Sequence, residues 1–178
     1  LIREEVDIAF FHTKERDDRR FVRHIYGEES LLLACNRRSK LARGRTAPRE
    51  APLTIKKTEL DLLGSMRFLI ASKEYYLCQL MREYIREIGI APQEMLEISH
   101  LNSIIHYLLK PGSDGVSLLA DFALRGTADT GQLSFFRVEG HDLSWYLTMN
   151  RLSGTSVSKI AAQFWEESTK LILYSHRG

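Results

Sequence analysis

The alternation of apolar segments between residues 66 and 119 constrains the fold more than any other feature of the sequence. Residues 66–71, 95–98 and 116–119 are short apolar runs that predict buried strands. Residues 77–88 and 101–109 lie between them and repeat apolar side chains with the 3.6-residue period of an amphipathic helix. This order of strand, helix, strand, helix and strand predicts a parallel α/β lobe with right-handed crossovers.

Similar patterns extend the fold on both sides of this lobe. Four further apolar runs predict strands at residues 6–11, 30–35, 133–138 and 143–149. The charged residues 14–29 and the basic residues 36–50 are predicted to run over the surface. A last helix is predicted to have one face formed by Val157, Ile160, Ala161, Phe164 and Ser168.

Polar side chains stand where the predicted helices begin. Ser72 is expected to cap the first helix, and Ser99 or Asn102 lies near the start of the second. Thr155 or Ser156 is expected to cap the last. Hydroxyl and amide side chains suit this position because they accept hydrogen bonds from free backbone N–H groups.

Composition excludes several classes of protein. The 178 residues are 44% hydrophobic and 27% charged, so the chain can bury a core. Its apolar runs are too short for a spanning helix, and the charged residues after Leu1 leave no signal-peptide core. A chain that opens on Leu1 is expected to be part of a longer protein. Cys35 and Cys78 lie among apolar residues, which favours buried thiols in a reducing cytoplasm.

The sequence carries no motif for cofactor, metal or nucleophile chemistry. It has no GxGxxG, no Walker loop and no GxSxG, and its six histidines lack the spacing of metal ligands. We therefore expect no cofactor, no metal and no enzymatic activity. The net charge of +2 does not favour nucleic acid, and residues 155–164 match only part of a helix-turn-helix.

A basic cluster in residues 36–50 has three interpretations. It could bind an anion, lie near DNA phosphates or form a solvated loop, and the last is favoured. Its members are Arg37, Arg38, Lys40, Arg43 and Arg45.

Polar side chains also follow two strands of the predicted parallel lobe. Ser72 and Lys73 follow the first strand, and Ser99, His100 and Asn102 follow the second. Ligands of open parallel sheets collect beyond the carboxyl ends of the strands, where helix N-termini present free N–H groups. These two loops are therefore candidates for binding a small anion, although serines that simply cap helices would explain the same pattern.

Four segments, in order along almost the whole chain, resemble the regulatory domain of LysR-type transcriptional regulators. They are LIREEVDIAFF, ESLLLACNRRSKLA, LNSIIHYLLKPGSDGVSLLADFAL and SWYLTMNRLSGTSVSKIAAQFWEES. The sequence departs from the family pattern at Asn36 and Ser39, where Pro and His are usual, and at Ala120, where Pro is common.

The resemblance implies a two-lobed α/β fold of the type 2 periplasmic-binding-protein kind, with an effector cleft between the lobes. The first lobe is expected to contain residues 1–64 with 132–178, and the second residues 65–131. The family's first lobe begins with a strand and a helix that would precede Leu1, and we expect this chain to lack them. Family members form homodimers or tetramers and bind DNA through an N-terminal winged helix-turn-helix, which we also do not expect in this chain; no membrane partner is expected.

The resemblance also implies which residues line the cleft. We expect Ser72, His100 and Asn102 to hydrogen-bond an acidic or polar group of a small-molecule effector, and Phe11 to cover an apolar part of it. The full set of expected effector contacts is Ser72, Lys73, His100, Asn102, Ser103, Phe11, His12 and Asp121.

Two other functions remain open on the same fold. An extracytoplasmic solute-binding protein would require a signal peptide, and the cysteines argue mildly against it. An enzyme, such as a dehydratase of aromatic amino-acid synthesis, would need a general acid or base in the cleft. His12 or His100 could serve, but no neighbouring residue marks a catalytic set.

Overall fold

The computed structural model describes residues 6–124 and 130–170. The chain divides into two compact units. Unit 1 comprises Leu1–Glu29 and Ser144–Gly178, and unit 2 comprises Ser30–Leu143. Each unit is described by itself below.

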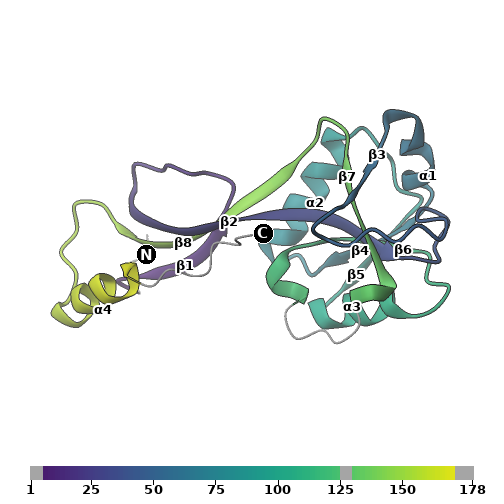
Figure 1. Cartoon of the computed structure of the whole chain (residues 1–178). Coiled ribbons are helices and arrows are strands. Elements are labelled where there is room, and N and C mark those ends of the chain that lie inside the picture. The colour runs from purple at the N-terminus through teal and green to yellow at the C-terminus, as the bar shows by residue number, and fades with distance from the viewer. Residues whose placement is uncertain (1–5, 125–129, 171–178) are drawn as a thin grey trace. The chain divides into compact units, whose positions relative to one another are not determined.

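Unit 2 is built on a mixed sheet with the strand order β3-β7-β2-β6-β4-β5 (Figure 1). β4, β5 and β6 are mutually parallel, whereas β2 runs antiparallel to β6 and β7. The predicted parallel α/β lobe is therefore confirmed. The strands are β2 (Phe21–Asn36, whose last seven residues belong to unit 2), β3 (Leu53–Ile55), β4 (Arg67–Ala71), β5 (Glu94–Ile98), β6 (Gly115–Leu119) and β7 (Leu133–Val138).

The helices of unit 2 cover the parallel strands. β5 and β6 lie on either side of β4, so right-handed crossovers place α2 (Tyr76–Glu87) and α3 (Leu101–Leu109) on opposite faces of the sheet. All five residues of β6 are consequently buried. The shorter helices are α1 (Leu60–Gly64) and the 3-10 turns η1 (Lys57–Glu59), η2 (Asp121–Leu124) and η3 (Thr130–Gln132).

Unit 1 combines a three-stranded sheet with one helix. β1 (Ala9–Thr13) pairs antiparallel with β8 (Leu143–Leu152), which in turn pairs with the first part of β2. The helix α4 (Lys159–Thr169) contacts this sheet through Phe164, whose ring lies edge-on to Phe10 at 6.2 Å between centroids. Ile160 on the same helix is 82% exposed.

Several sequence expectations for unit 1 were wrong. The first strand begins at Ala9 rather than at residue 6, and it is only half-buried. Residues 21–29, expected to run over the surface, form the first part of β2 because their backbone pairs with β8, and most of their side chains are half-buried. Ser158 caps α4 by accepting a hydrogen bond from the Ala161 N–H at 3.2 Å, in place of Thr155 or Ser156.

The expected lobe boundaries and the observed units divide the chain differently. The boundaries expected near residues 64 and 132 both fall inside unit 2, because β7 completes the unit 2 sheet by pairing with β2 and β3. The lobe assignment stays a prediction.

Candidate functional site

The candidate site lies at the carboxyl ends of the parallel strands of unit 2. Ala71 pairs with Ile98, so Ser72 and Ser99 leave the sheet side by side. From there the chain continues into α2 on one face and into α3 on the other. Such a switch point, where neighbouring loops diverge to opposite faces, is the usual ligand crevice of an open α/β sheet.

Both helices begin at this edge without a side-chain cap. The N-cap residues are Tyr75 for α2 and His100 for α3, and neither accepts a side-chain hydrogen bond from its helix. The expectation that Ser72 caps α2 was therefore wrong, because Ser72–Tyr75 forms a turn, closed by the Tyr75 N–H donating to the Ser72 carbonyl at 2.9 Å, before the helix starts. Uncapped N-termini favour a negatively charged or hydrogen-bond-accepting group.

Side chains around this edge are accessible to a ligand. Ser72 is half-buried, and Lys73, His100, Asn102 and Ser103 are exposed. The structure thus brings these five predicted residues to one edge of one sheet. Lys73 is tied to the neighbouring strand through its backbone, whose N–H donates to Glu97 Oε1 at 3.3 Å.

Sequence reasoning missed three residues at this edge. Glu97 lies in the predicted strand 95–98 and was not singled out, yet its carboxylate accepts the Lys73 N–H. Tyr75 and Tyr76 begin α2 and are 51% and 38% exposed, which is unusual for large aromatic side chains. Two adjacent tyrosines directly before an apolar helix were the available signal.

The third parallel strand, β6, ends at the same edge. Arg67 pairs with Gly115 and Phe68 with Val116, which brings the carboxyl end of β6 beside that of β4. Ala120 follows β6 and is buried, and Asp121 begins η2. The Asp121 side chain lies outside the described part of the structure.

Two predicted site residues, Phe11 and His12, lie on β1 in unit 1. The His12 ring stacks on Trp145 with 4.2 Å between ring centroids, and its Nε2 lies 3.5 Å from Glu29 Oε2. Trp145 donates its Nε1–H to the same carboxylate oxygen at 3.1 Å. His12 therefore belongs to a compact aromatic and acidic cluster that spans β1, β2 and β8.

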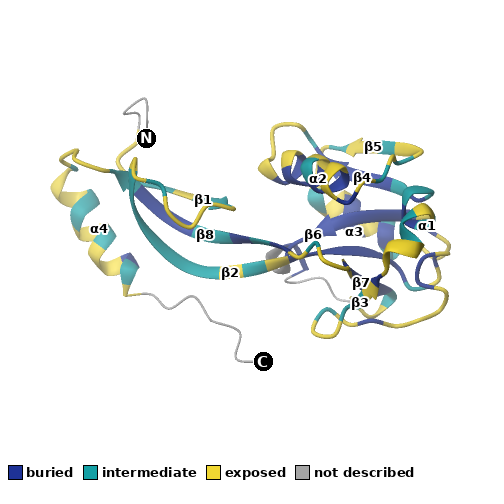
Figure 2. Cartoon of the chain, turned by 90° about the horizontal axis from the view of Figure 1, so that it is seen from above, coloured by how far each residue is buried: buried dark blue, intermediate teal, exposed yellow. Residues whose placement is uncertain are grey.

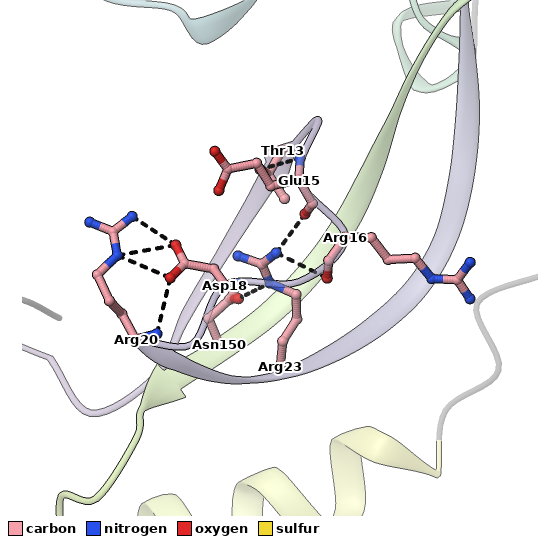
Figure 3. Close-up of polar contacts among 7 residues, drawn as sticks. All are labelled: Thr13, Glu15, Arg16, Asp18, Arg20, Arg23 and Asn150. Atoms are coloured by element: carbon pink, nitrogen blue, oxygen red, sulfur yellow. Dashed lines mark hydrogen bonds and ion pairs between the residues drawn. The ribbon is translucent and has the colours of Figure 1, made fainter.

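A polar network fixes the strand that carries Phe11. Arg23 donates Nε–H to Asn150 Oδ1 at 2.7 Å and Nη1–H to the carbonyls of Glu15 and Arg16 (Figure 3). Asn150 donates to Thr148 Oγ1 at 2.8 Å, and Thr148 donates to the Phe11 carbonyl at 2.9 Å. Because Asn150 and Thr148 are fully buried, these bonds satisfy groups that would otherwise be costly inside the unit.

The loop between β1 and β2 is held by a second ion pair. Arg20 binds both carboxylate oxygens of Asp18, with the shortest contact 2.7 Å from Nη2 to Oδ2 (Figure 3). Hydrogen bonds from the Arg20 side chain and backbone lower the pKa of Asp18 from 3.8 to about 2. The carboxylate therefore stays charged and pairs with Arg20 well into acid.

Other features do not add to this site. Among the residues that the structure describes, no group of three His, Cys, Asp or Glu side chains is placed to hold a metal. Within the same residues, no helix is long and apolar enough to cross a membrane. A cavity of about 280 Å³ in unit 2 contains none of the predicted site residues; it is lined by Thr46, Pro48, Arg49, Glu50, Leu124, Thr130, Gly131, Leu133 and Phe135.

Comparison with known proteins identifies the family. The model of the LysR substrate binding domain matches residues 1–171. The chain therefore belongs to the LysR substrate binding domain family. Comparison with the sequences of curated proteins gave no match.

Solved structures show the fold. The CcmR regulatory domain of Synechocystis PCC6803 in complex with 2-PG is similar with a TM-score of 0.73 at 15% identity, covering 95% of this chain and 74% of that one. Full-length HypT of Salmonella typhimurium, a LysR-type transcriptional regulator, has a TM-score of 0.66 at 18% identity, covering 96% of this chain and 53% of that one.

A third similar structure is the QuiR effector binding domain in complex with shikimate. Its TM-score is 0.64 at 14% identity, covering 96% of this chain and 73% of that one. The fold is thus the mixed α/β fold of the type 2 periplasmic-binding-protein kind that the sequence predicted.

Proposed function

We propose that this chain binds a small polar or anionic effector as the ligand-sensing part of a LysR-type transcriptional regulator. The observation that carries the proposal is the pair of uncapped helix N-termini at neighbouring strand ends, after Ala71 and Ile98. Their free N–H groups, the half-buried Ser72 and the exposed His100 and Asn102 side chains offer several donors to one acceptor-rich group.

The related domains support a small-molecule occupant. The CcmR domain was solved with 2-PG and the QuiR domain with shikimate. In this chain Ser72, His100 and Asn102 hydrogen-bond the polar group of the effector. Lys73 and Ser103 contact the effector next to that group. Phe11, His12 and Asp121 remain predicted effector contacts.

The proposed role is regulation rather than catalysis. Effector binding shifts the population of conformations, and a bound regulator transmits that shift to its complex with DNA. The protein acts in the cytoplasm as a homodimer or tetramer and returns its effector unchanged. Recovery of a bound compound without chemical alteration after prolonged incubation checks the last point.

Thermal unfolding across a panel of small carboxylates and phosphates tests the proposal. A compound at a hundredfold excess over its Kd stabilises the protein by about 2.7 kcal/mol, which raises Tm by about 5–10 °C for a chain of this size. The double variant Ser72→Ala with Asn102→Ala should bind that compound at least about tenfold more weakly, since it loses two hydrogen bonds.

A matched control lies on the same helix. His106 is exposed on α3, about one and a half turns from the N-terminus that forms the site, so His106→Gln should leave the affinity unchanged. The proposal fails if no compound raises Tm, or if His106→Gln weakens binding as much as the double variant.

A further inference from the structure

Unit 2 carries a concentrated positive charge that the effector site does not use. Residues 37–45, here called the basic loop, contain five cationic side chains and no acidic one. The net charge of the whole chain is only +2, so the charge is gathered locally rather than spread. The five are Arg37, Arg38, Lys40, Arg43 and Arg45.

The basic loop is a folded segment with an anchored backbone, and not a flexible solvated loop. Ser39, Leu41 and Ala42 are buried beneath it at 4%, 1% and 0% exposure. The Arg37 N–H donates to the Gln132 carbonyl at 2.8 Å, and the Gly44 N–H closes the loop by donating to the Arg37 carbonyl at 3.1 Å. Anchors inside and across the loop therefore hold its backbone in a defined conformation.

The residue before the loop adds a further anchor. Asn36 is 1% exposed and donates its side-chain amide to the carbonyls of Leu108 and Lys110, at 2.9 and 3.1 Å. Its Oδ1 accepts the Arg38 N–H at 3.0 Å. One buried side chain thus ties the basic loop to the end of α3.

The last part of the loop holds an arginine in an unfavourable backbone conformation. Arg43 has φ of +51°, in the left-handed region that glycine and asparagine adopt more readily. It is followed by Gly44 at φ +75°. The fold therefore presents an exposed guanidinium at a position where a smaller, uncharged residue would fit the backbone better.

Two of the cations are available to a partner. Among the residues that the structure describes, neither Arg38 nor Arg43 forms an ion pair with a carboxylate, and both are exposed. Lys40 is anchored by donating to the Ser65 carbonyl at 2.8 Å, and it stays exposed. Arg45 bends back to the carbonyls of Ala42 and Leu41.

The basic loop and the candidate effector site lie at opposite edges of one sheet. β2 runs antiparallel to β6, with Cys35 paired to Val116 near the start of β6 and Leu32 paired to Leu119 at its end. The loop therefore follows β2 at the edge where the parallel strands begin, whereas Ser72 and His100 stand where they end. The two surfaces can be altered separately.

We propose that the basic loop contacts the phosphate backbone of duplex DNA. Guanidinium groups form paired hydrogen bonds with phosphate oxygens, and several cations on one anchored loop suit a regularly charged polymer better than a single small anion. Duplex DNA is the polyanion available to a member of a family that includes the transcriptional regulator HypT. The contact adds affinity without reading sequence.

Fluorescence anisotropy of the 178-residue chain with a labelled 25-base-pair duplex tests this contact as NaCl is varied. The double variant Arg38→Gln with Arg43→Asn removes two cations and places asparagine at the left-handed position. Binding at low salt should weaken at least about tenfold, and the slope of log K against log salt should fall by about 2. Its Tm should equal or exceed that of the parent, so lost binding cannot be lost folding.

The control removes the same charge elsewhere in unit 2. Arg82 and Arg86 are exposed on α2, and Arg82→Gln with Arg86→Gln should leave the affinity and the salt slope near the parent values. The proposal is overturned if the parent chain does not bind the duplex at low salt, or if both double variants lose binding equally. The rise in Tm caused by the effector, measured on the same variants, does not depend on whether the basic loop binds DNA.

Discussion

The two units of this chain reach stability by different means. Unit 2 buries a dense apolar core along β4, β6 and β7 (Figure 2). Phe68, Phe135 and Phe136 belong to this core, each with at most 2% exposure. Among the described residues of unit 1, only two apolar side chains, Trp145 and Met149, are buried. Phe10 and Phe164 in the same unit remain about half exposed. A similar pairing of sheet and helix therefore encloses far less apolar surface in unit 1.

Polar contacts contribute a larger share of the stability of unit 1 than of unit 2. The chain of bonds from Arg23 through Asn150 to Thr148 runs through its interior, and Asp18 with Arg20 fixes its connecting loop. Each buried bond from Asn150 and Thr148 contributes about 1 kcal/mol net, whereas a buried large apolar side chain contributes two to three times as much. We therefore expect the same kind of substitution to lower the free energy of unfolding more in unit 2 than in unit 1.

Truncating one phenylalanine in each unit should give the largest contrast. Phe68→Ala removes a fully buried ring from β4 and should lower the free energy of unfolding by about 3–5 kcal/mol. Phe10→Ala removes a ring that is 49% exposed and should cost about 1–2 kcal/mol, mainly its stacking on Tyr26. Urea unfolding followed by circular dichroism measures both. Equal losses would contradict the contrast between the units.

Adding a methyl group at a glycine should change the free energy of unfolding differently in the two units, by an amount intermediate among these predictions. In Gly115→Ala the new Cβ would lie 2.9 Å from Leu69 Cδ1 and 2.9 Å from Tyr107 Cε1, so we expect a loss of about 1–3 kcal/mol. Gly27 in unit 1 has no atom within 4 Å of such a Cβ. Gly27→Ala should therefore be neutral or stabilise by up to about 1 kcal/mol, and a loss there similar to that of Gly115→Ala would show that unit 1 is tightly packed.

The smallest expected effect depends on pH. Because the pKa of Asp18 is lowered from 3.8 to about 2 in the folded protein, its contribution is present above about pH 4 and is lost as the pH falls towards 2. The stability difference between the parent and Asp18→Asn should therefore shrink between pH 4 and pH 2 in urea titrations. The matched control is Asp17→Asn, which removes a charge from the same loop and keeps the contact of Asp18 with Arg20.

The elements with a clear period were predictable from the sequence, and the half-buried ones were not. The 3.6-residue spacing placed α2 and α3 within a residue or so of their bounds, because unit 2 buries one full face of each. The segment Phe21–Glu29 mixes aromatic, charged and glycine residues. Its strand conformation follows from pairing with β8, which no local pattern reports.

The candidate site was predictable to the level of the sheet edge. The order of parallel strands placed Ser72 and His100 at neighbouring strand ends, as the pairing of Ala71 with Ile98 confirms. The capping residues of α2 and α3 could not be predicted, because hydroxyl-bearing residues lie at several positions near the start of each helix. At α4 the capping residue, Ser158, also makes a long-range contact, because its hydroxyl donates to Asp7 Oδ2 at 2.8 Å. Local helix propensity does not predict such a contact.

The two cysteines make the protein a convenient subject for chemical labelling. Cys35 and Cys78 are both buried, and burial raises the pKa of the Cys35 thiol to about 11 while Ser39 hydrogen-bonds its sulfur. A maleimide reacts with an accessible thiolate, so the folded chain should label slowly at neutral pH. A single cysteine introduced on the surface would then be the one fast-reacting handle for a spin label or a dye.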